Sequence, residues 1–291
     1  MAGDEPKRAR FRTIADADLP AVCELLSQGF PERSRDYWTH ALAALAQRDA
    51  PQEYPRYGYL IDNGENIVGV ILTIFSRKSG GAARCNLSSW YVDPRYRAGG
   101  YASALIAAAL RFKEAIYINV SPAQHTWPVI EAQGFRRYTE GQMLCFPALS
   151  FSGGGASVAR YDALDDYGGA LTDEERSLLD EHQSYGCQVY VVRAGDRAYP
   201  FVFLARRVMR EILPTLQLIY CRDFDDFTHF AGVLGRRLAL RGYFSVLIDA
   251  SERPPDLFGV FLKNRGPKYF KGPQSPRLGD LSYCESVLFG P

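Results

Sequence analysis

The sequence lacks long apolar runs and a strong excess of either charge. No apolar run approaches the roughly 20 residues that span a bilayer, so we expect no membrane partner. The formal net charge is only +1, whereas nucleic-acid-binding domains carry a clear basic excess, so we expect no nucleic-acid partner. Residues 1–12 are charged and contain no apolar stretch typical of a secretory signal. We therefore expect a cytoplasmic protein.

Several catalytic motifs are missing as well. No two of the six cysteines form a CxxC pair, which argues against a metal knuckle or a redox pair, and we expect buried, reduced thiols. No Gly-x-Ser-x-Gly elbow, HExxH helix or Walker lysine is present. Asp223, Asp225 and Asp226 stand together, but no further oxygen ligands at metal-site spacing accompany them. We interpret them as a helix-capping cluster and expect no bound metal.

What is present is the composition of an ordinary globular protein, with 47% hydrophobic and 23% charged residues. At about 150 residues per domain, the length of 291 residues predicts two domains. The strongest break in composition is a Gly/Ser-rich stretch that contains Gly153, Gly154 and Gly155. We interpret residues 150–158 as a flexible linker between domains at 1–149 and 159–291.

The hydrophobic pattern of the first domain predicts a mixed, mainly antiparallel sheet with helices on both faces. The turn Asp62-Asn63-Gly64 signals a hairpin. The expected order is a strand at 10–14, a helix capped by Asp16 or Asp18, a helix at 34–47, strands at 57–61, 67–75 and 85–92, a helix at 100–112, a strand at 115–120, a short helix ending at 133, and two strands near 136 and 143.

The second domain repeats this order with different residues, which indicates a degenerate internal duplication. Thr172 and Glu175 have the spacing of a capping box before its first helix. The expected elements after that helix are strands at 188–192, 200–205 and 216–221, a helix at 224–241, a strand at 244–248, a short helix at 257–263 and a last strand at 283–289.

The most informative segment comes directly after the strand that ends at Val92. The chain turns through Arg97-Ala98-Gly99-Gly100 into a helix that begins Tyr101-Ala102-Ser103. The first helical turn has backbone N–H groups without intrahelical partners, and the helix dipole makes this end positive, so a diphosphate fits there. Small residues allow close approach, Arg97 adds positive charge, and the Ser103 hydroxyl adds a donor. The alternative interpretation is an ordinary glycine-rich strand–helix loop.

Here the sequence resembles the GCN5-related N-acetyltransferase (GNAT) superfamily. Val92-Asp93-Pro94 followed by Arg97-x-x-Gly100-x-Ala102 is similar to its acetyl-CoA motif, and Glu131-Ala132-Gln133-Gly134-Phe135 is similar to its later helix ending in Gly-Phe. The resemblance implies a splayed sheet, with the pantetheine arm between two strands that separate after Val92. It also implies that backbone groups of Trp90, Tyr91 and Val92 bind that arm and polarise the thioester carbonyl.

The sequence departs from the family pattern at its catalytic positions. Ile130 stands where the family often has a tyrosine general acid, and Ala123 or Gln124 replaces a common asparagine. The third strand has no glutamate to act as the base for the amine. Ser88, Ser89 and Tyr91 stand there instead.

Three residues remain as catalytic candidates. His125 comes after the strand near residue 120, and its ordinary pKa near neutrality suits a general base; the alternative is a solvent-facing histidine at a helix start. Asn119 either orients substrate or merely ends a strand, and Tyr91 lies in the pantetheine segment. The basic, aromatic tract 266–273 either contacts an anionic group of the substrate or forms an ordered surface loop.

Together these features predict two GNAT-like domains in tandem, of which only the first binds acetyl-CoA or another acyl-CoA. Where the second domain would carry the Arg-Gly turn it has carboxylates, which repel a diphosphate. The expected activity is direct acyl transfer to an amine of a small-molecule or peptide acceptor, by a monomer or a homodimer. Two alternatives are a non-catalytic CoA-binding or partner-binding module and a transferase that uses a longer acyl-CoA or aminoacyl-tRNA.

Overall fold

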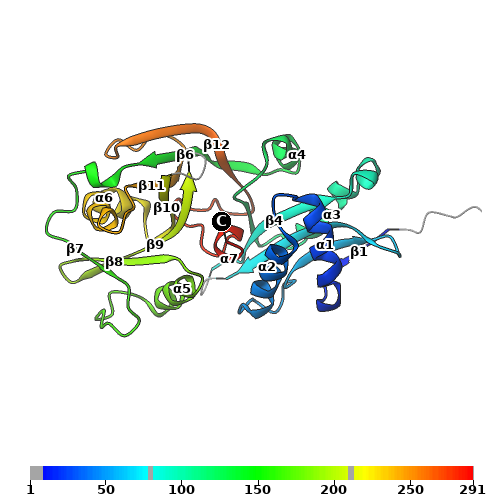
Figure 1. Cartoon of the computed structure of the whole chain (residues 1–291), viewed down its shortest axis with the longest axis horizontal. Coiled ribbons are helices and arrows are strands. Elements are labelled where there is room, and N and C mark those ends of the chain that lie inside the picture. Colours follow the sequence, from blue (N-terminus) through cyan, green and yellow to red (C-terminus); the bar gives the residue numbers. More distant parts are fainter. Residues whose placement is uncertain (1–8, 78–80, 209–212, 291) are drawn as a thin grey trace, which may run out of the picture. The chain divides into compact units, whose positions relative to one another are not determined.

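The computed structural model describes residues 9–77, 81–208 and 213–290, which form two compact units (Figure 1). The first unit comprises residues 1–119 with the later segments 272–274 and 283–290. The second comprises the described residues of 120–271 and 275–282. The C-terminal part of the chain thus returns to the first unit after most of the second has formed.

The sheet of the first unit has the strand order β1-β2-β3-β4-β5. Its strands are antiparallel neighbours except for the parallel pair β4–β5. The strands are β1 (Arg10–Thr13), β2 (Gly58–Asp62), β3 (Ile67–Ser76), β4 (Arg84–Val92) and β5 (Ile116–Asn119). The expected hairpin between β2 and β3 is confirmed, and so is the expected mixed, mainly antiparallel fold class.

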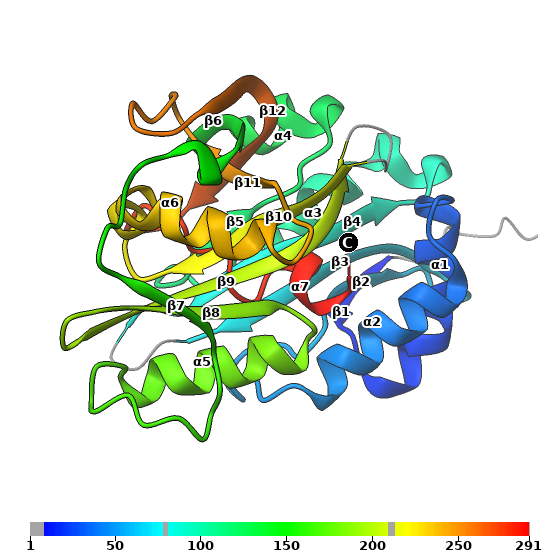
Figure 2. The same cartoon turned by 60° about the vertical axis from the view of Figure 1, so that its left-hand side comes forward.

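Helices cover both faces of this sheet. Helices α1 (Leu19–Gly29) and α2 (Arg35–Gln47) pack together on one face, in front of the strands in Figure 2. Helix α3 (Tyr101–Ala109) packs on β2 and β3 from the other face. Fully buried aliphatic side chains fill the space between these layers, as in Leu26, Leu42, Leu60 and Ile71.

Asp18 does not cap α1 as expected. Its side chain instead accepts a hydrogen bond from the N–H of Ala15, at the start of the short 3-10 helix η1 (Asp16–Asp18) that leads into α1. The N-cap of α2 is Ser34, whose hydroxyl accepts a hydrogen bond from the N–H of Tyr37. The expected start of this second helix is therefore confirmed.

The C-terminal segment of the first unit is helical, whereas a strand was expected over 283–289. Helix α7 (Glu285–Leu288) contacts α2. The guanidinium of Arg48, just after α2, donates to the carbonyl of Phe75 and lies 5.7 Å from the ring centroid of Tyr283. The Asn86 side chain on β4 donates to the Glu285 carboxylate. The strand prediction was wrong because side-chain contacts with α2 and β4, rather than a ladder, hold this segment.

The sheet of the second unit has the strand order β12-β6-β11-β10-β9-β8-β7, with β10–β11 as its one parallel neighbour pair among the described residues. The strands are β6 (Arg136–Cys145), β7 (Ser157–Arg160), β8 (Gln188–Ala194), β9 (Arg197–Val208), β10 (Leu213–Cys221), β11 (Ser245–Ala250) and β12 (Gly259–Lys271). The helices are α4 (Trp127–Ala132), α5 (Asp173–Ser184) and α6 (Phe224–Ala239).

Two predictions for this unit were wrong. Residues 257–263 do not form a helix, because β12 pairs antiparallel with β6 through Gly259↔Cys145 and onward to Phe270↔Arg136. That partner is more than 100 residues away in the sequence, so local periodicity could not reveal it. The two strands expected near residues 136 and 143 are one strand, because β6 continues through the register shifts opposite β12.

The Gly/Ser-rich stretch, residues 150–158, was expected to be a flexible linker, but its start packs against α6. The Ser152 hydroxyl donates to the Thr228 carbonyl at 3.3 Å and accepts from the Gly232 N–H at 3.2 Å. A side chain at Gly232 would clash with the carbonyls of Ser150 and Ser152. The close approach of two backbones explains why glycine is required on the helix side of this contact.

The buried cation Lys268 on β12 is held by two acceptors. Its ammonium donates to the Val120 carbonyl at 2.6 Å and lies 3.5 Å from the Asp249 carboxylate, which also accepts from Gln142 at 3.0 Å. Removing one partner of a buried pair leaves the other charge uncompensated. Lys268→Met should therefore lower the free energy of unfolding by about 3–5 kcal/mol in urea titrations.

The exposed Lys263 on the same strand is the matched control. Lys263→Met should change stability by no more than about 0.5 kcal/mol. The double variant Lys268→Met/Asp249→Leu removes both charges and should recover much of the loss. Equal losses in the single and double variants would contradict the ion-pair explanation.

The capping box of α5 provides a pH-dependent contact. Glu175 accepts from the Thr172 N–H at 3.0 Å and from Arg222 at 2.7 and 2.9 Å. Burial raises the pKa of Glu175, but the Arg222 and Thr172 hydrogen bonds lower it further, so the pKa lies below its ordinary value of 4.5. The stability that this carboxylate contributes is therefore fully present above about pH 4.5 and lost as the pH falls through the lower, folded-state pKa.

We expect Glu175→Gln to be less stable than the wild type at pH 7 and the difference to shrink below pH 4.5. Thermal unfolding at a series of pH values measures this. Glu174→Gln, at the exposed neighbouring position, should show a smaller difference at pH 7. A stability gap for Glu175→Gln that stays constant down to about pH 3 would contradict the assignment.

Candidate functional site

Strands β4 and β5 run together for only a short distance. Their parallel pairing covers Arg84↔Ile116, Cys85↔Tyr117 and Asn86↔Ile118 and then stops, although β4 continues to Val92. The expected splay in the sheet is therefore present, but the expectation that the strands separate after Val92 was wrong. They separate after Asn86, six residues earlier, because β5 ends its pairing at Ile118 while β4 continues through a bulge to Val92.

That bulge is centred on Ser89. Ser88 lies opposite Leu72 and Tyr91 opposite Val70, so Ser89 and Trp90 together face the single residue between Leu72 and Val70. Ser89 has a φ of 52°, a left-handed conformation that is uncommon for residues other than glycine. Because alternate residues of β3 share a face, the bulge keeps Tyr91 on the same face as Ser88 and Asn86.

Beyond the bulge, the backbone of β4 faces β3 and the splay alternately. The Asp93 N–H donates to the Val68 carbonyl on β3 at 2.9 Å. The groups of Val92 and Trp90 therefore point away from β3, toward the side where β5 has departed. The indole N–H of Trp90 is buried and has no acceptor in the described part of the chain. A buried donor of this kind favours an acceptor from a bound molecule.

The turn after β4 is a short 3-10 helix, η2 (Pro94–Gly99), that Asp93 caps. The Asp93 carboxylate accepts from the Arg95 N–H at 2.9 Å and pairs with the Arg95 guanidinium at 2.6 Å. These hydrogen bonds hold the pKa of Asp93 below its ordinary value. The Asp93 carbonyl also accepts from the Tyr96 N–H at 2.8 Å. The direction in which the chain leaves the sheet is thus fixed by one ionised carboxylate.

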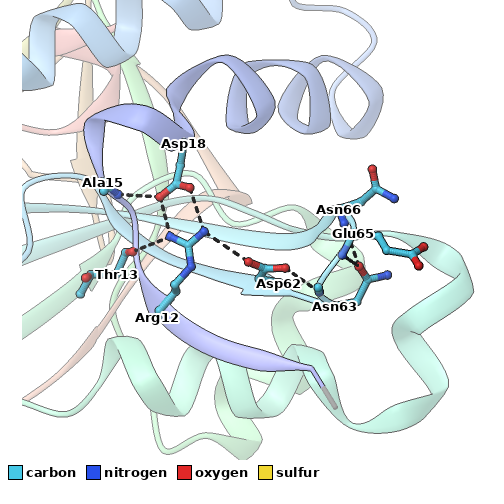
Figure 3. Close-up of polar contacts among 9 residues, drawn as sticks. Arg12, Thr13, Ala15, Asp18, Asp62, Asn63, Glu65 and Asn66 are labelled. Carbon is cyan, nitrogen blue, oxygen red and sulfur yellow. Dashed lines mark hydrogen bonds and ion pairs between the residues drawn. The ribbon is translucent and has the colours of Figure 1, made fainter. Parts of the chain in front are cut away.

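A second network joins β1 to the β2–β3 hairpin (Figure 3). Arg12 on β1 donates to both oxygens of Asp18, at 2.5 and 2.8 Å, and to Asp62 at 3.4 Å. The Asn63 side chain accepts two backbone N–H groups within the hairpin turn and donates to the Tyr96 hydroxyl at 2.8 Å. The hairpin and η2 are therefore connected by side-chain hydrogen bonds.

The start of α3 has the features expected of an anion site. Gly100 precedes it with a φ of 73°, and no atom lies within 4 Å of the position where its Cβ would be. The first bond that closes the helix runs from the Ala104 N–H to the Gly100 carbonyl. Because α3 begins at Tyr101, the N–H groups of Tyr101, Ala102 and Ser103 have no acceptor within the helix.

Arg97 lies between this helix start and β4. Its Nε donates to the Val92 carbonyl at 2.9 Å, and its guanidinium lies 5.6 Å from the centre of the Tyr91 ring. The side chain is exposed, so the rest of the guanidinium faces solvent at the entrance to the turn. The Arg97 guanidinium is thus held to the backbone through Nε, and its other two nitrogens face solvent.

The predicted site residues fall on several elements, and one set of them is continuous in the chain. Segments 90–92 and 97–103 lie consecutively at the splayed edge, in the first unit. Asn119 ends β5 in the same unit. His125 belongs to the second unit, on the exposed 3-10 helix η3 (Gln124–Thr126).

Several other expectations have clear outcomes. Tyr91 packs its ring against Gly29 of α1, where an added Cβ would lie 2.5 Å from the ring.

Asp223 accepts from the Asp225 N–H and caps α6, as interpreted. The tract 266–273 is not a surface loop, because Lys268, Tyr269 and Phe270 are buried in β12. All six cysteines are buried free thiols, as expected.

Two residues of this region were not identified from the sequence as part of a site. Asn86, a buried residue at the last paired position of β4, donates to Glu285 of α7. Nearly 200 positions separate them in the chain. No local pattern marks either residue.

Comparison with known proteins agrees with this geometry. The acetyltransferase (GNAT) family matches residues 19–135, a span that includes the bulged strand, the turn and α3. No curated protein matches the chain by sequence. Residues 19–135 are therefore similar to a GNAT-family acetyltransferase domain.

Solved structures of the same fold are similar over most of the chain. A GCN5-related N-acetyltransferase from Anabaena variabilis has 12% identity and a TM-score of 0.58, covering 90% of this chain and 72% of that one. A putative acetyltransferase from Pyrococcus horikoshii has 12% identity and a TM-score of 0.54, covering 95% and 93%. A GCN5-related N-acetyltransferase from Kribbella flavida has 14% identity and a TM-score of 0.56, covering 90% of this chain and 71% of that one. At these identities the likeness concerns the fold.

Two features are absent from the part of the chain that the structure describes. Within residues 9–77, 81–208 and 213–290, no helix is both long and apolar enough to cross a membrane. The same described residues contain no group of three His, Cys, Asp or Glu side chains arranged to hold a metal ion.

The strained residue of the bulge gives a stability prediction. Ser89→Gly should raise the free energy of unfolding by a few tenths to about 1 kcal/mol, because glycine adopts a positive φ without steric cost. Ser89→Val should lower it by roughly 1–2 kcal/mol. Urea unfolding of the three proteins measures both changes.

Ser88, next to it in an extended conformation, is the control. Ser88→Gly makes the same side-chain deletion and should be destabilising by about 0.5–1 kcal/mol. If both glycine variants lose stability equally, the strain assigned to Ser89 is contradicted.

Proposed function

We propose that the protein is an N-acyltransferase that moves an acetyl or other short acyl group from CoA to an amine. The observation that carries this proposal is the start of α3, with Gly100 in a left-handed conformation and Arg97 beside it, directly after a strand that has separated from its neighbour. The family match over the same residues supports it.

The diphosphate of CoA would lie on the turn formed by Arg97, Ala98, Gly99 and Gly100 and on the first residues of α3. The N–H groups of Tyr101, Ala102 and Ser103 have no acceptor within the helix and would supply donors aligned with the positive end of its dipole. The open space at Gly100 admits a phosphate close to the backbone. The Ser103 hydroxyl is exposed and adds a further donor.

The pantetheine arm would continue along the unpaired edge of β4. Backbone groups of Val92 and Trp90 face that edge, so the arm can take the place of the missing strand. A backbone N–H there would polarise the thioester carbonyl as negative charge develops on its oxygen. The amine would attack directly, with positioning and this electrostatic stabilisation supplying most of the rate.

The catalytic residues of this reaction are a separate question from CoA binding. Ile130 is buried and apolar, so no acid is available at that position. We keep His125 and Asn119 as candidate catalytic residues and Tyr91 as a candidate that acts through its backbone, since its ring packs between α1 and Arg97. The acceptor belongs to the class of small-molecule or peptide amines.

We also propose that residues 159–291 are a degenerate copy of 1–149, joined through 150–158. Strands β8, β9 and β10, the crossover α6 and the parallel β11 repeat the order of β2 to β5. In both units the parallel pairing covers only three residue pairs. At the start of α6, however, Asp223 occupies the cap and Arg222 pairs with Glu175, which leaves no site for a diphosphate.

The cysteines bear on the compartment in which the reaction would take place. Six buried free thiols fit a reducing compartment, and we propose the cytoplasm. The competing proposal is a module that binds CoA without turnover. It is favoured by the absence of acidic or histidine side chains in the sequence of β4.

Calorimetric titration of acetyl-CoA tests the site. Arg97→Ala should weaken binding about tenfold or more, because charge-assisted hydrogen bonds to phosphate contribute roughly 1.5–3 kcal/mol. Gly100→Glu should abolish measurable binding, since its carboxylate would face the diphosphate. CoA release measured with a thiol reagent, with and without an amine panel, then tests turnover.

Matched variants separate binding from folding. Arg35→Ala removes an exposed arginine on α2 and should leave affinity unchanged. Gly100→Ala meets no atom in the structure and adds no charge, so it should weaken binding far less than Gly100→Glu. No binding by the wild type would refute the CoA site, and binding with no turnover of any amine would favour the non-catalytic module.

A further inference from the structure

The C-terminal segment brings a carboxylate to the strand that separates from its neighbour. Glu285, the first residue of α7, accepts a hydrogen bond from the side-chain amide of Asn86 on β4. Asn86 is 2% exposed, so this contact lies inside the first unit. The strand itself, Arg84–Val92, contains no aspartate, glutamate or histidine, and neither does β5.

Asn86 lies at the point where the pairing of β4 with β5 ends. Asn86 and Ile118 form the last pair between β4 and β5, and the splay opens immediately after them. Because of the bulge, Asn86 shares a face of the sheet with Ser88 and Tyr91. The Glu285 carboxylate therefore lies at the closed end of the splay, on the face covered by α1 and α2.

A thioester in the splay and an amine on that face would require a base. An alkylamine has a pKa near 10 and is protonated at neutral pH, so it must lose a proton before it can attack. We propose that Glu285 is the catalytic base that takes this proton, in a reaction that rests on the acyl transfer proposed above.

Asn86 has the complementary role of a positioning residue. Its amide nitrogen donates to the Glu285 carboxylate and so holds it beside the last paired residue of β4. Its amide oxygen is buried and has no hydrogen-bond donor among the residues described. That oxygen can accept an N–H from the amine, which would place the nitrogen beside both the carboxylate and the splay.

The segment around Glu285 is anchored by charged and aromatic groups. The guanidinium of Arg48 lies 5.7 Å from the ring centre of Tyr283, and Arg84 shares a face of β4 with Asn86. Arg48 and Arg84 are thus cations on the two parts of the first unit, the end of α2 and strand β4, that contact this segment. Both arginines keep their charge at neutral pH, so neither changes its charge during the assay.

Atoms and charges balance in the proposed step. The ammonium R–NH₃⁺ gives one proton to the Glu285 carboxylate, directly or through a water molecule. The nitrogen lone pair of R–NH₂ then forms a C–N bond to the thioester carbon, and the C–S bond breaks. The departing sulfur takes the second nitrogen proton and leaves as CoA thiol, while Glu285 returns its proton to solvent. The products are the amide R–NH–CO–CH₃, CoA-SH and one released proton.

The test uses the full-length protein and an amine that the wild type acetylates, drawn from alkylamines, polyamines, amino sugars and lysine peptides. Glu285→Gln keeps the size and can still pair with Asn86. We expect kcat/KM to fall about 100-fold or more, with an unchanged Kd for acetyl-CoA and an unchanged Tm. The defect should shrink at high pH and with a fluorinated, less basic analogue of the same amine, because both supply the neutral nucleophile.

A reciprocal exchange distinguishes a base from a structural contact. Asn86→Asp/Glu285→Gln moves the carboxylate across the same hydrogen bond and should recover at least about tenfold of the lost kcat/KM. Equal Tm values for the single and double variants would attribute the recovery to chemistry.

The outcomes separate this proposal from the one on which it depends. A wild type that binds acetyl-CoA but acetylates no amine overturns the transferase function, and the base with it. A wild type that turns over while Glu285→Gln retains full activity at every pH overturns only the base. Loss of Tm and of acetyl-CoA binding in Glu285→Gln, with no recovery in the exchange variant, would assign Glu285 a structural role and also overturn it.

Discussion

The separation of β4 from β5 after Asn86 is the constraint on which the rest of the first unit depends. Ending a parallel ladder inside a domain leaves backbone donors and acceptors without partners, at a cost of roughly 1–3 kcal/mol for each buried group. The structure tolerates this because β4 remains paired with β3 through Val92. The same edge then becomes the place where another extended molecule can complete the ladder.

The turn η2 and helix α3 follow directly after the unpaired part of β4. Asp93 caps η2 and sets the direction of the chain, Asn63 of the hairpin holds Tyr96, and the first N–H groups of α3 have no acceptor within the helix. Arg97 is tied by one nitrogen to the Val92 carbonyl, so its charge is positioned at little entropic cost when an anion binds. The second unit repeats the strand order, but its arginine at the corresponding turn is already paired with Glu175.

The base that we propose comes from a different part of the chain than the residues proposed to bind CoA. The proposed transfer to a protonated amine requires a base, and neither β4 nor β5 contains an acidic or histidine residue. The carboxylate that reaches β4 comes from α7, which joins the first unit after the chain has built most of the second. This connectivity links completion of the N-terminal unit to the folding of the whole chain.

The sequence by itself determined the features that depend on neighbouring residues. The β2–β3 hairpin arises from Asp62-Asn63-Gly64, the cap of α5 from Thr172 and Glu175, and the turn at 97–100 from its glycines. In each case the residues that make the hydrogen bonds or permit the dihedral angles lie within a few positions. The fold class could be predicted from the same local periods.

Only the tertiary structure decided the features that depend on distant partners. Residues 259–263 form a strand because β6 supplies the ladder, and the Gly/Ser-rich stretch is held because α6 lies against it. The separation of β4 at Asn86, rather than at Val92, depends on where β5 ends its pairing. The pairing of Asn86 with Glu285 brings together residues nearly 200 positions apart. Neither side chain has a local signature, since a hydrogen bond between them exists only after the sheet, α2 and α7 have packed.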